Sequence, residues 1–243
     1  MWSWIPAVAL WVCLMSSPAS SWLNTSWISS NTQMIWNLTV DHIKLAVPVI
    51  VLVFFLSIPI GYAAHRAGLS RRWKPARSAV IVATGILYGI PSLALFVVLP
   101  VILGTSVLSP LNVIVALLLY GLALQVRVVA EAFDAADPTA KLAATAIGYS
   151  MWQRFWLVDL PLAGNSIVAG MRVVAASTIS LISVGALIGV TSLGDLLTAG
   201  FQRSFPTQIL VGIVGIVVLA IVADIVLVIA GRLAMPWRSK VVA

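Results

Sequence analysis

Five long apolar segments constrain the fold of this chain more than any other feature of its sequence. They cover roughly residues 45–64, 79–103, 110–130, 163–190 and 208–231. A helix that crosses the hydrocarbon core of a bilayer needs about 20 mostly apolar residues, and each segment is long enough. The chain is 61% hydrophobic and only 9% charged, whereas soluble domains are about one quarter charged. The sequence therefore predicts an all-α integral membrane protein with five core transmembrane helices.

A shorter apolar stretch, WSWIPAVALWVCLM, begins at Trp2 and is followed by SSPASS. It lacks the positively charged start of a secretory signal, so we expect an extra N-terminal membrane helix, spanning or interfacial, with a cleaved signal as the alternative. The expected partition has three parts. They are a hydrophobic segment with an external Trp-rich linker (1–40), a transmembrane domain (41–232) and a cytoplasmic tail (233–243).

Lysine and arginine gather in three places, which set the orientation of the chain. If the five spans alternate, all three places lie on one side, and the positive-inside rule makes that side the cytoplasm. Residues 16–44 and the loop 191–207 then lie outside. The three groups are Arg66, Arg71, Arg72, Lys74 and Arg77 after the first span, Arg127, Lys141 and Arg154 around the connection between the third and fourth spans, and Arg232, Arg238 and Lys240 after the last.

The remaining composition argues against several classes of function. The formal net charge of +7 follows the expected cytoplasmic ends rather than a compact basic face, so nucleic-acid binding is not expected. The single Cys13 cannot form an internal disulfide, and His42 and His65 are too few for a metal cluster or a Ser-His pair. No lysine precedes Ser or Thr, so there is no Walker A loop, and no GxSG or HExxH motif is present. We expect neither catalysis nor a cofactor in this chain.

A polar stretch, DPTAKLAATAIGYSMWQRFWLVDLP at 137–161, interrupts the apolar segments. Asp137 before Pro138 is typical of a helix start, because the carboxylate accepts free amide protons and proline loses no partner in the first turn. Gly148 is expected to end this helix in a left-handed conformation. Ser150 and Gln153 then form a capping box that starts a second short helix. We expect Pro161 to close that helix, because a proline disfavours helical geometry at Leu160.

The side chains of this stretch allow two interpretations. The small side chains around Ala143 and Ala144 would let another protein approach the backbone closely, with Met151, Trp152 and Trp156 as apolar bulk, so the two helices would fill a groove. Alternatively, the stretch is an amphipathic connector whose tryptophans rest in the headgroup region.

The pattern Ala143-Ala144-x3-Gly148-x9-Val158-x-Leu160-Pro161 resembles the EAA loop of ATP-binding-cassette (ABC) importer permeases, Glu-Ala-Ala-x3-Gly-x9-Ile-x-Leu-Pro. In that family the loop is the coupling helix that docks on the cytoplasmic ATPase. Here Leu142 replaces the glutamate and Val158 the isoleucine, so a salt bridge from the first position is lost. The resemblance implies an ATPase-coupling site at Asp137, Pro138, Ala143, Ala144, Gly148, Trp152, Leu160 and Pro161.

Three further stretches resemble the osmoprotectant group of this family, which imports glycine betaine, choline and carnitine. They are GIPSLAL at 89–95, LPLAGNSIVAGMR at 160–172 and GALIGVTSLGDLLTAG at 185–200. The resemblance implies the type I importer permease fold in a bacterial cytoplasmic membrane, and three partners: an ABC ATPase dimer that binds ATP and Mg, a second identical or homologous permease, and an extracytoplasmic binding protein. The alternatives are an amino-acid or methionine permease and an ion-coupled secondary transporter.

Candidate residues for the solute path come from two spans. Pro91 should kink its helix and free backbone carbonyls, which makes Tyr88, Pro91 and Ser92 candidates. In the fourth span Ser177 and Ser180 share one side at helical spacing. Packing is the alternative in both cases. If the solute is a quaternary ammonium compound, cation-π attraction is available from Tyr88, Phe96 and Tyr120.

Two charged residues within the spans also need an explanation. Arg172 is expected to reach the cytoplasmic headgroups or to pair with Glu131 or Asp134. Asp224 lies in the second half of the last span. For both we expect a structural pairing rather than contact with solute.

Overall fold

The computed structural model describes residues 23–235, and this part of the chain is helical without any strand. The expected N-terminal membrane helix, Arg238 and Lys240 lie outside the described residues. The helices, including a π-helical segment η2 and a 3₁₀ turn η3, are α2 (Thr25–Ser30), α3 (Thr32–Leu69), α4 (Lys74–Gly89), α5 (Ser92–Leu103), α6 (Pro110–Ala135), α7 (Pro138–Ala146), α8 (Met151–Arg154), η2 (Phe155–Asp159), α9 (Leu160–Gly185), η3 (Ala186–Ile188), α10 (Gly194–Gln202) and α11 (Pro206–Ala234).

Within the described residues, four helical stretches are long and apolar enough to cross a membrane: Thr32–Leu69, Pro110–Ala135, Met151–Ile188 and Pro206–Ala234. The expected second span is a fifth only if α4 and α5 are counted together, because the two are bent by 103°. Pro91 explains the break. It pushes Ile90 into an extended conformation (φ −72°, ψ 129°) and so ends α4. The kink expected at Pro91 is therefore a complete interruption of the span.

The first span is longer than the sequence suggested. Helix α3 begins at Thr32 and contains 38 residues, including Pro48 and Pro59. Polar residues of the segment expected outside, 16–44, such as Asn37 and Asp41, thus continue the same helix beyond its apolar part. Because hydropathy marks only the portion in hydrocarbon, it does not detect such an extension.

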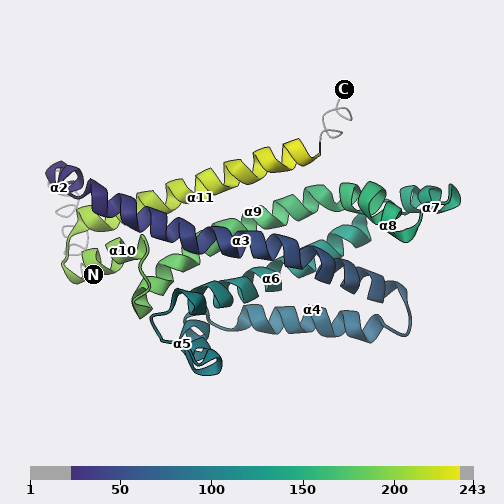
Figure 1. Cartoon of the computed structure of the whole chain (residues 1–243), viewed down its shortest axis with the longest axis horizontal. Coiled ribbons are helices and arrows are strands. Elements are labelled where there is room, and N and C mark those ends of the chain that lie inside the picture. The colour runs from purple at the N-terminus through teal and green to yellow at the C-terminus, as the bar shows by residue number, and fades with distance from the viewer. Residues whose placement is uncertain (1–22, 236–243) are drawn as a thin grey trace, which may run out of the picture.

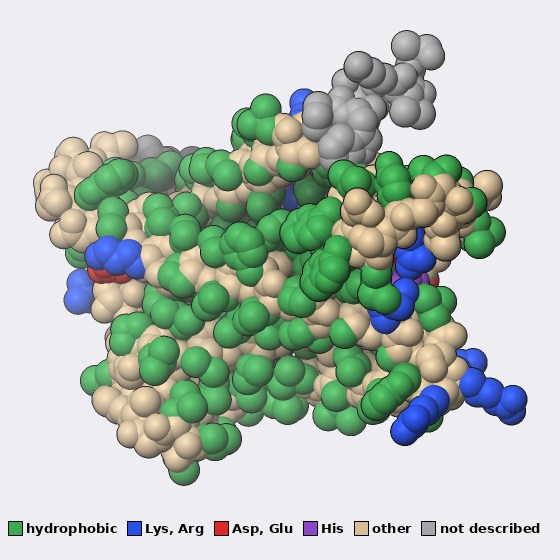
Figure 2. All heavy atoms as spheres, turned by 45° about the vertical axis from the view of Figure 1, so that its right-hand side comes forward, with side chains coloured by type: hydrophobic (Ala, Val, Ile, Leu, Met, Phe, Trp, Pro, Cys, Tyr) green, Lys and Arg blue, Asp and Glu red, His purple; other side chains and the backbone are tan. Residues whose placement is uncertain are grey.

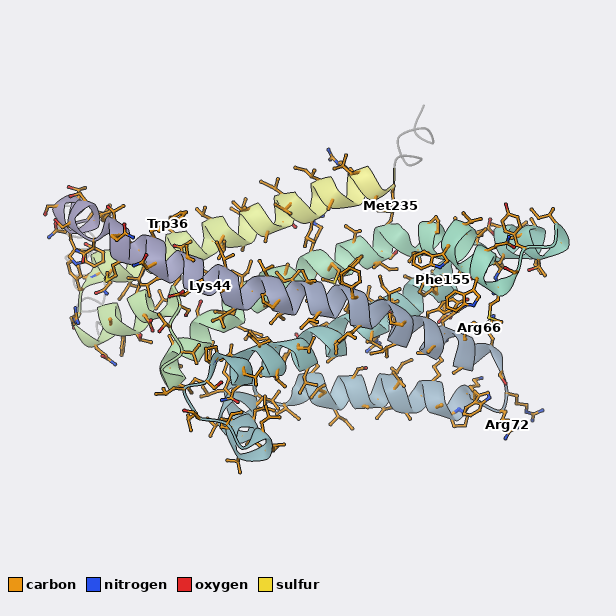
Figure 3. All side chains as sticks on the ribbon, viewed as in Figure 1. Trp36, Lys44, Arg66, Arg72, Phe155 and Met235 are labelled. Atoms are coloured by element: carbon orange, nitrogen blue, oxygen red, sulfur yellow. The ribbon has the colours of Figure 1, made fainter. Side chains whose placement is uncertain are left out.

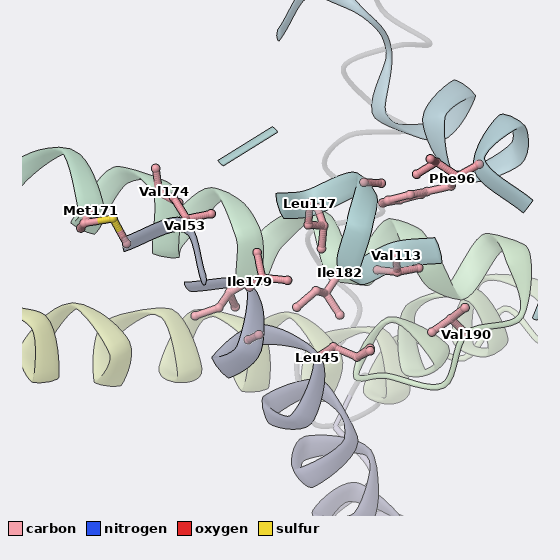
Figure 4. Packing of buried hydrophobic residues seen from close by; sticks show 14 residues of the cluster. Leu45, Val53, Phe96, Val113, Leu117, Met171, Val174, Ile179, Ile182 and Val190 are labelled. Atoms are coloured by element: carbon pink, nitrogen blue, oxygen red, sulfur yellow. The ribbon is translucent and has the colours of Figure 1, made fainter. Parts of the chain in front are cut away.

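Helix α3 packs against α6 and α9, and their apolar faces form the main core (Figure 4). Val53 of α3, Leu117 of α6 and Ile182 of α9 are among its buried side chains. Gly121 permits the close approach of α6 to α3, because a Cβ there would lie only 2.5 Å from Cγ2 of Val53. Helix α11 lies along α9 and α10 on the far side of the bundle from α4 (Figure 1).

Most of the described basic side chains lie at one end of the bundle (Figure 2). That end contains the α3–α4 turn, α7, α8 and the C-terminal end of α11, whereas α2, α5 and α10 lie at the other (Figure 1). Arg66 and Arg72 lie at the first end and Trp36 toward the second (Figure 3). Figure 2 shows lysine and arginine side chains gathered over the first end. The three basic regions therefore share one end, as alternating spans require.

Candidate functional site

The polar segment begins with a short helix that local hydrogen bonds fix at both ends. Asp137 is the N-cap of α7, and its carboxylate accepts a hydrogen bond of 2.8 Å from the backbone N–H of Thr139. At the other end Gly148 has φ +89°. The N–H groups of Gly148 and Tyr149 donate to the carbonyls of Thr145 and Ala144. This is the Schellman arrangement, so the expected left-handed glycine is present.

The expected capping box at the start of α8 is also present. The backbone N–H of Gln153 donates to the Ser150 hydroxyl at 3.3 Å, and the Gln153 side chain accepts from the Ser150 N–H at 2.8 Å. The turn between α7 and α8 is thus defined by hydrogen bonds on both of its sides.

The predicted helix end at Pro161 is wrong. The chain continues from α8 through the π-helical segment η2 into α9 without leaving helical geometry, and Leu160 has φ −65° and ψ −45°. In η2 the N–H of Leu160 donates to the carbonyl of Phe155, five residues back. Pro161, which has no N–H, stands where this spacing changes to the α-helical one, so its missing donor is tolerated. Helix α8, η2 and the fourth span α9 therefore form one continuous helical element.

Aromatic side chains anchor this continuous element to the bundle. Phe155 is buried, with its ring centroid 4.6 Å from that of Tyr62 of α3. Tyr62 in turn lies 5.0 Å from Phe133 of α6. The buried Asp159 carboxylate accepts hydrogen bonds from the Tyr62 hydroxyl at 3.4 Å and from Arg154 at 3.3 Å. A displacement of α8 must therefore act on α3 and α6 as well as on α9.

Polar contacts hold the other helices of this end together. The Lys141 ammonium of α7 donates to the backbone carbonyl of Phe133 at 2.6 Å, which ties α7 to the end of α6. Asp134 of α6 forms an ion pair with Arg77 of α4 and accepts from His65 of α3 at 2.5 Å. Three spans therefore meet beside α7.

The outer face of α7 and α8 has no partner within the described part of the chain. Leu142, Ile147 and Trp152 are 71%, 71% and 73% exposed. Of the two motif alanines of α7, Ala143 is exposed, whereas Ala144 is buried. Such a protruding apolar surface on a rigid element is suited to contact with another protein.

The predicted path residues meet in one cavity of about 590 Å³ between α4, α6 and α9, with the first residue of α5 at its edge. Tyr88, Ser92, Ser177 and Ser180 all contribute to its lining. Pro91 lies at the helix break next to Ser92 without lining the cavity itself.

Sequence reasoning missed most of the third wall of this cavity. Helix α6 contributes Leu117, Tyr120, Gly121 and Leu124 to the lining, and only Tyr120 was expected there, as an aromatic. Its apolar sequence carries no pattern that would separate a cavity wall from packing. The expectation for Phe96 is wrong, because its side chain is fully buried in the main core.

The predicted partners of Arg172 are also wrong. Its guanidinium binds both carboxylate oxygens of Asp224 on α11, at 2.5 and 2.8 Å. Glu131 instead pairs with Arg127 one turn away on α6. The structural pairing expected for Arg172 and Asp224 is therefore present, but between these two residues.

The comparison with known families agrees with this geometry. The sequence profile of the family described as "Binding-protein-dependent transport system inner membrane component" matches residues 57–237, about three quarters of the chain. The chain belongs to this family. It is therefore the permease component of an ABC importer.

Its curated relatives cover most of its length. The chain is 30% identical over 197 residues to the osmoprotectant import permease protein OsmW of Salmonella typhimurium. The aligned residues cover 80% of this chain and 88% of that protein. It is 27% identical over 200 residues to the glycine betaine/carnitine/choline transport system permease protein OpuCD of Bacillus subtilis, covering 82% and 83%.

Solved structures support the fold. The MetNI methionine ABC transporter, in an inward-facing conformation, contains a chain that matches with a TM-score of 0.69 at 19% identity, covering 85% of this chain and 97% of that one. An amino acid ABC transporter with histidines matches with a TM-score of 0.65 at 16% identity, covering 86% and 98%. The fold expected from the sequence, that of a type I importer permease, is therefore confirmed.

Proposed function

We propose that this permease imports osmoprotectants, that is, quaternary ammonium solutes such as glycine betaine, choline or carnitine. The functions in the names of the relatives support this class, and the matches extend over 80% of the chain. The amino-acid alternative rests on structural similarity at 16–19% identity, which concerns the fold alone. The uncharged cavity between α4, α6 and α9 also favours a solute that needs no ionic partner.

The observation that carries the coupling role is the protruding apolar face of α7 and α8 on an anchored helix. The proposed partner there is a cytoplasmic ABC ATPase dimer that binds ATP and Mg, since this chain has no Walker A loop. The end with α7, α8 and the C-terminus then lies in the cytoplasm, in agreement with its basic residues. A second permease of the same or a homologous sequence completes the membrane part. An extracytoplasmic binding protein delivers solute near α10.

Transmission of motion follows from the contacts of the continuous α8–α9 element. When ATP draws the two ATPase subunits together, the force on α7 and α8 passes directly along η2 into α9, which forms a wall of the cavity. The Tyr62–Phe155 contact and the Lys141 bond to Phe133 carry the same motion to α3 and α6. The spans then alternate access to the cavity between the two sides of the membrane.

Docking in this chain depends on shape and apolar contact. Leu142 occupies the position of the family glutamate and is 71% exposed. Burial of a leucine side chain stabilises an interface by about 1.5–3 kcal/mol. Burial of Leu142 in the interface can therefore offset the loss of an exposed salt bridge, which contributes about 0–1 kcal/mol.

The test is to tag the chain, purify it in mild detergent at native expression level and identify its companions by mass spectrometry. Recovery of a Walker A ATPase with a binding protein supports the proposal. Recovery of the chain alone, together with solute uptake driven by an ion gradient, would replace it with a secondary transporter.

A matched pair of variants locates the ATPase contact. Leu142→Ser should lower recovery of the ATPase several-fold, because it removes apolar contact area from the docking face. Leu233→Ser is the control, since Leu233 is 77% exposed near the same end but lies on α11. Equal recovery from both variants would refute docking on α7.

A further inference from the structure

The cavity between α4, α6 and α9 combines aromatic rings with hydroxyl groups and has no ionic side chain in its described lining. Its volume of about 590 Å³ lies within the range of small-molecule sites, roughly 300–1,000 Å³. Tyr88 and Tyr120 supply the rings, and aliphatic hydroxyls come from Ser92, Ser177, Ser180 and Thr178. The other lining groups are mainly aliphatic. The chemistry of a bound solute must therefore match rings and hydroxyls alone.

The two tyrosine rings belong to different helices and meet at an angle. Tyr88 lies near the end of α4 and Tyr120 in the middle of α6, with ring centroids 5.8 Å apart and ring planes inclined by 58°. Because both rings line the cavity, they form two adjoining walls of it. A cation within about 6 Å of a ring centroid is attracted by the negative face of the ring. A single positive group in this corner can be attracted by both rings at once.

The absence of a carboxylate from the described lining selects among cations. A primary ammonium carries three N–H donors, each of which needs an acceptor when water is removed. A quaternary ammonium has no N–H, so aromatic faces can replace its water without leaving a donor unpaired. The serine hydroxyls are donors for a carboxylate or hydroxyl at the other end of the solute.

We propose that this cavity is a binding site within the permease for quaternary ammonium solutes, with Tyr88 and Tyr120 as its selectivity residues. The inference rests on the proposed function and extends it: the permease itself, and not the binding protein alone, selects the solute. Ser92, Ser177 and Ser180 orient the polar end of the solute. The two tyrosine rings bind the positively charged end of the solute.

The direct experiment is equilibrium binding of radiolabelled choline to the purified permease–ATPase complex without any binding protein. Tyr88→Leu and Tyr120→Leu should each weaken binding roughly 3- to 30-fold, the range that one cation-π contact provides. Tyr120→Phe keeps the ring and should stay within about 2-fold of the wild type. Phe55→Leu is the matched control, because it removes an exposed aromatic of α3 that does not line this cavity.

A neutral isostere separates charge recognition from shape. The alcohol 3,3-dimethyl-1-butanol has the shape of choline without its charge, so it should compete at least 10-fold more weakly than unlabelled choline. Equal competition, unchanged binding in both leucine variants, or no saturable binding to the wild-type complex would overturn the proposal.

Uptake into proteoliposomes containing the complete transporter distinguishes failure of the tyrosine site from failure of the proposed function. ATP-dependent choline or glycine betaine uptake by the wild type, with a raised KM in the leucine variants, supports the tyrosine site and the proposed function together. Uptake that is unchanged in those variants overturns the tyrosine site and leaves the proposed function intact. No uptake of either solute, although the ATPase hydrolyses ATP and the complex is assembled, overturns the proposed function itself.

Discussion

Gly148 sets the conformation of the turn between α7 and α8, and its replacement by alanine gives a sharp test of the coupling loop. Its φ of +89° lies in the left-handed region, where an L side chain costs about 1–2 kcal/mol. A Cβ at this position would meet no heavy atom within 4 Å, so no steric clash adds to that cost. The penalty of Gly148→Ala is therefore purely one of backbone conformation. It corresponds to a factor of about 5 to 30 in the equilibrium between native and altered turn.

Solute-stimulated ATP hydrolysis and uptake by the reconstituted transporter measure the consequence. The alanine variant should insert into the membrane as the wild type does, but its affinity for the ATPase should fall by up to that factor. Gly148→Asn should be less affected, because asparagine tolerates the left-handed region better than alanine.

Gly85→Ala is the matched control. Gly85 lies within α4, and a Cβ added there would likewise meet no heavy atom within 4 Å, so the change adds helix propensity without strain. Wild-type coupling in Gly148→Ala, or an equal loss in Gly85→Ala, would refute the reasoning about the turn.

Two further predictions concern α7 and the loop at the other end. Lys141→Met removes the charged hydrogen bond to the Phe133 carbonyl, worth about 1.5–3 kcal/mol, and should increase proteolysis of α7 and lower coupled ATPase activity. Lys44→Met removes only an exposed surface pair and should do neither. Burial raises the pKa of the Asp195 carboxyl above its usual range, against an opposing hydrogen bond from the Ser192 N–H. A carboxyl group with a raised pKa in the folded protein contributes its full stabilisation below the pKa of the unfolded chain, about 4. This stabilisation is lost as the pH rises through the pKa of the folded protein. The melting temperature of Asp195→Asn minus that of the wild type should therefore increase from pH 3.5 to 7. A difference that stays constant over this range would contradict the prediction.

Local signals in the sequence predicted the elements of the coupling loop that depend on neighbouring residues alone. The N-cap at Asp137, the left-handed Gly148 and the capping box of Ser150 each involve atoms at most five residues apart, and all three are present. The spans were equally accessible, because hydropathy reports directly on burial in hydrocarbon. These features need no knowledge of the tertiary fold.

Features that depend on tertiary contacts or on irregular helical geometry were not predictable. The partner of Arg172 is 52 residues away on α11, and sequence spacing favoured acids of α6 instead. The helix end predicted at Pro161 failed, because the π-helical segment before it accommodates the missing N–H. Most of the α6 wall of the cavity also remained hidden, since Leu117, Gly121 and Leu124 stand in an apolar stretch of that helix.

ATP-dependent uptake is the measurement that tests the central claim most directly. The chain is reconstituted with the ATPase and binding protein recovered with it, and uptake of radiolabelled glycine betaine is followed with ATP, without ATP, and with an imposed ion gradient in its place. The account predicts accumulation only with ATP, and reduced accumulation in the Gly148→Ala variant. Accumulation driven by the ion gradient in the absence of ATP would contradict it.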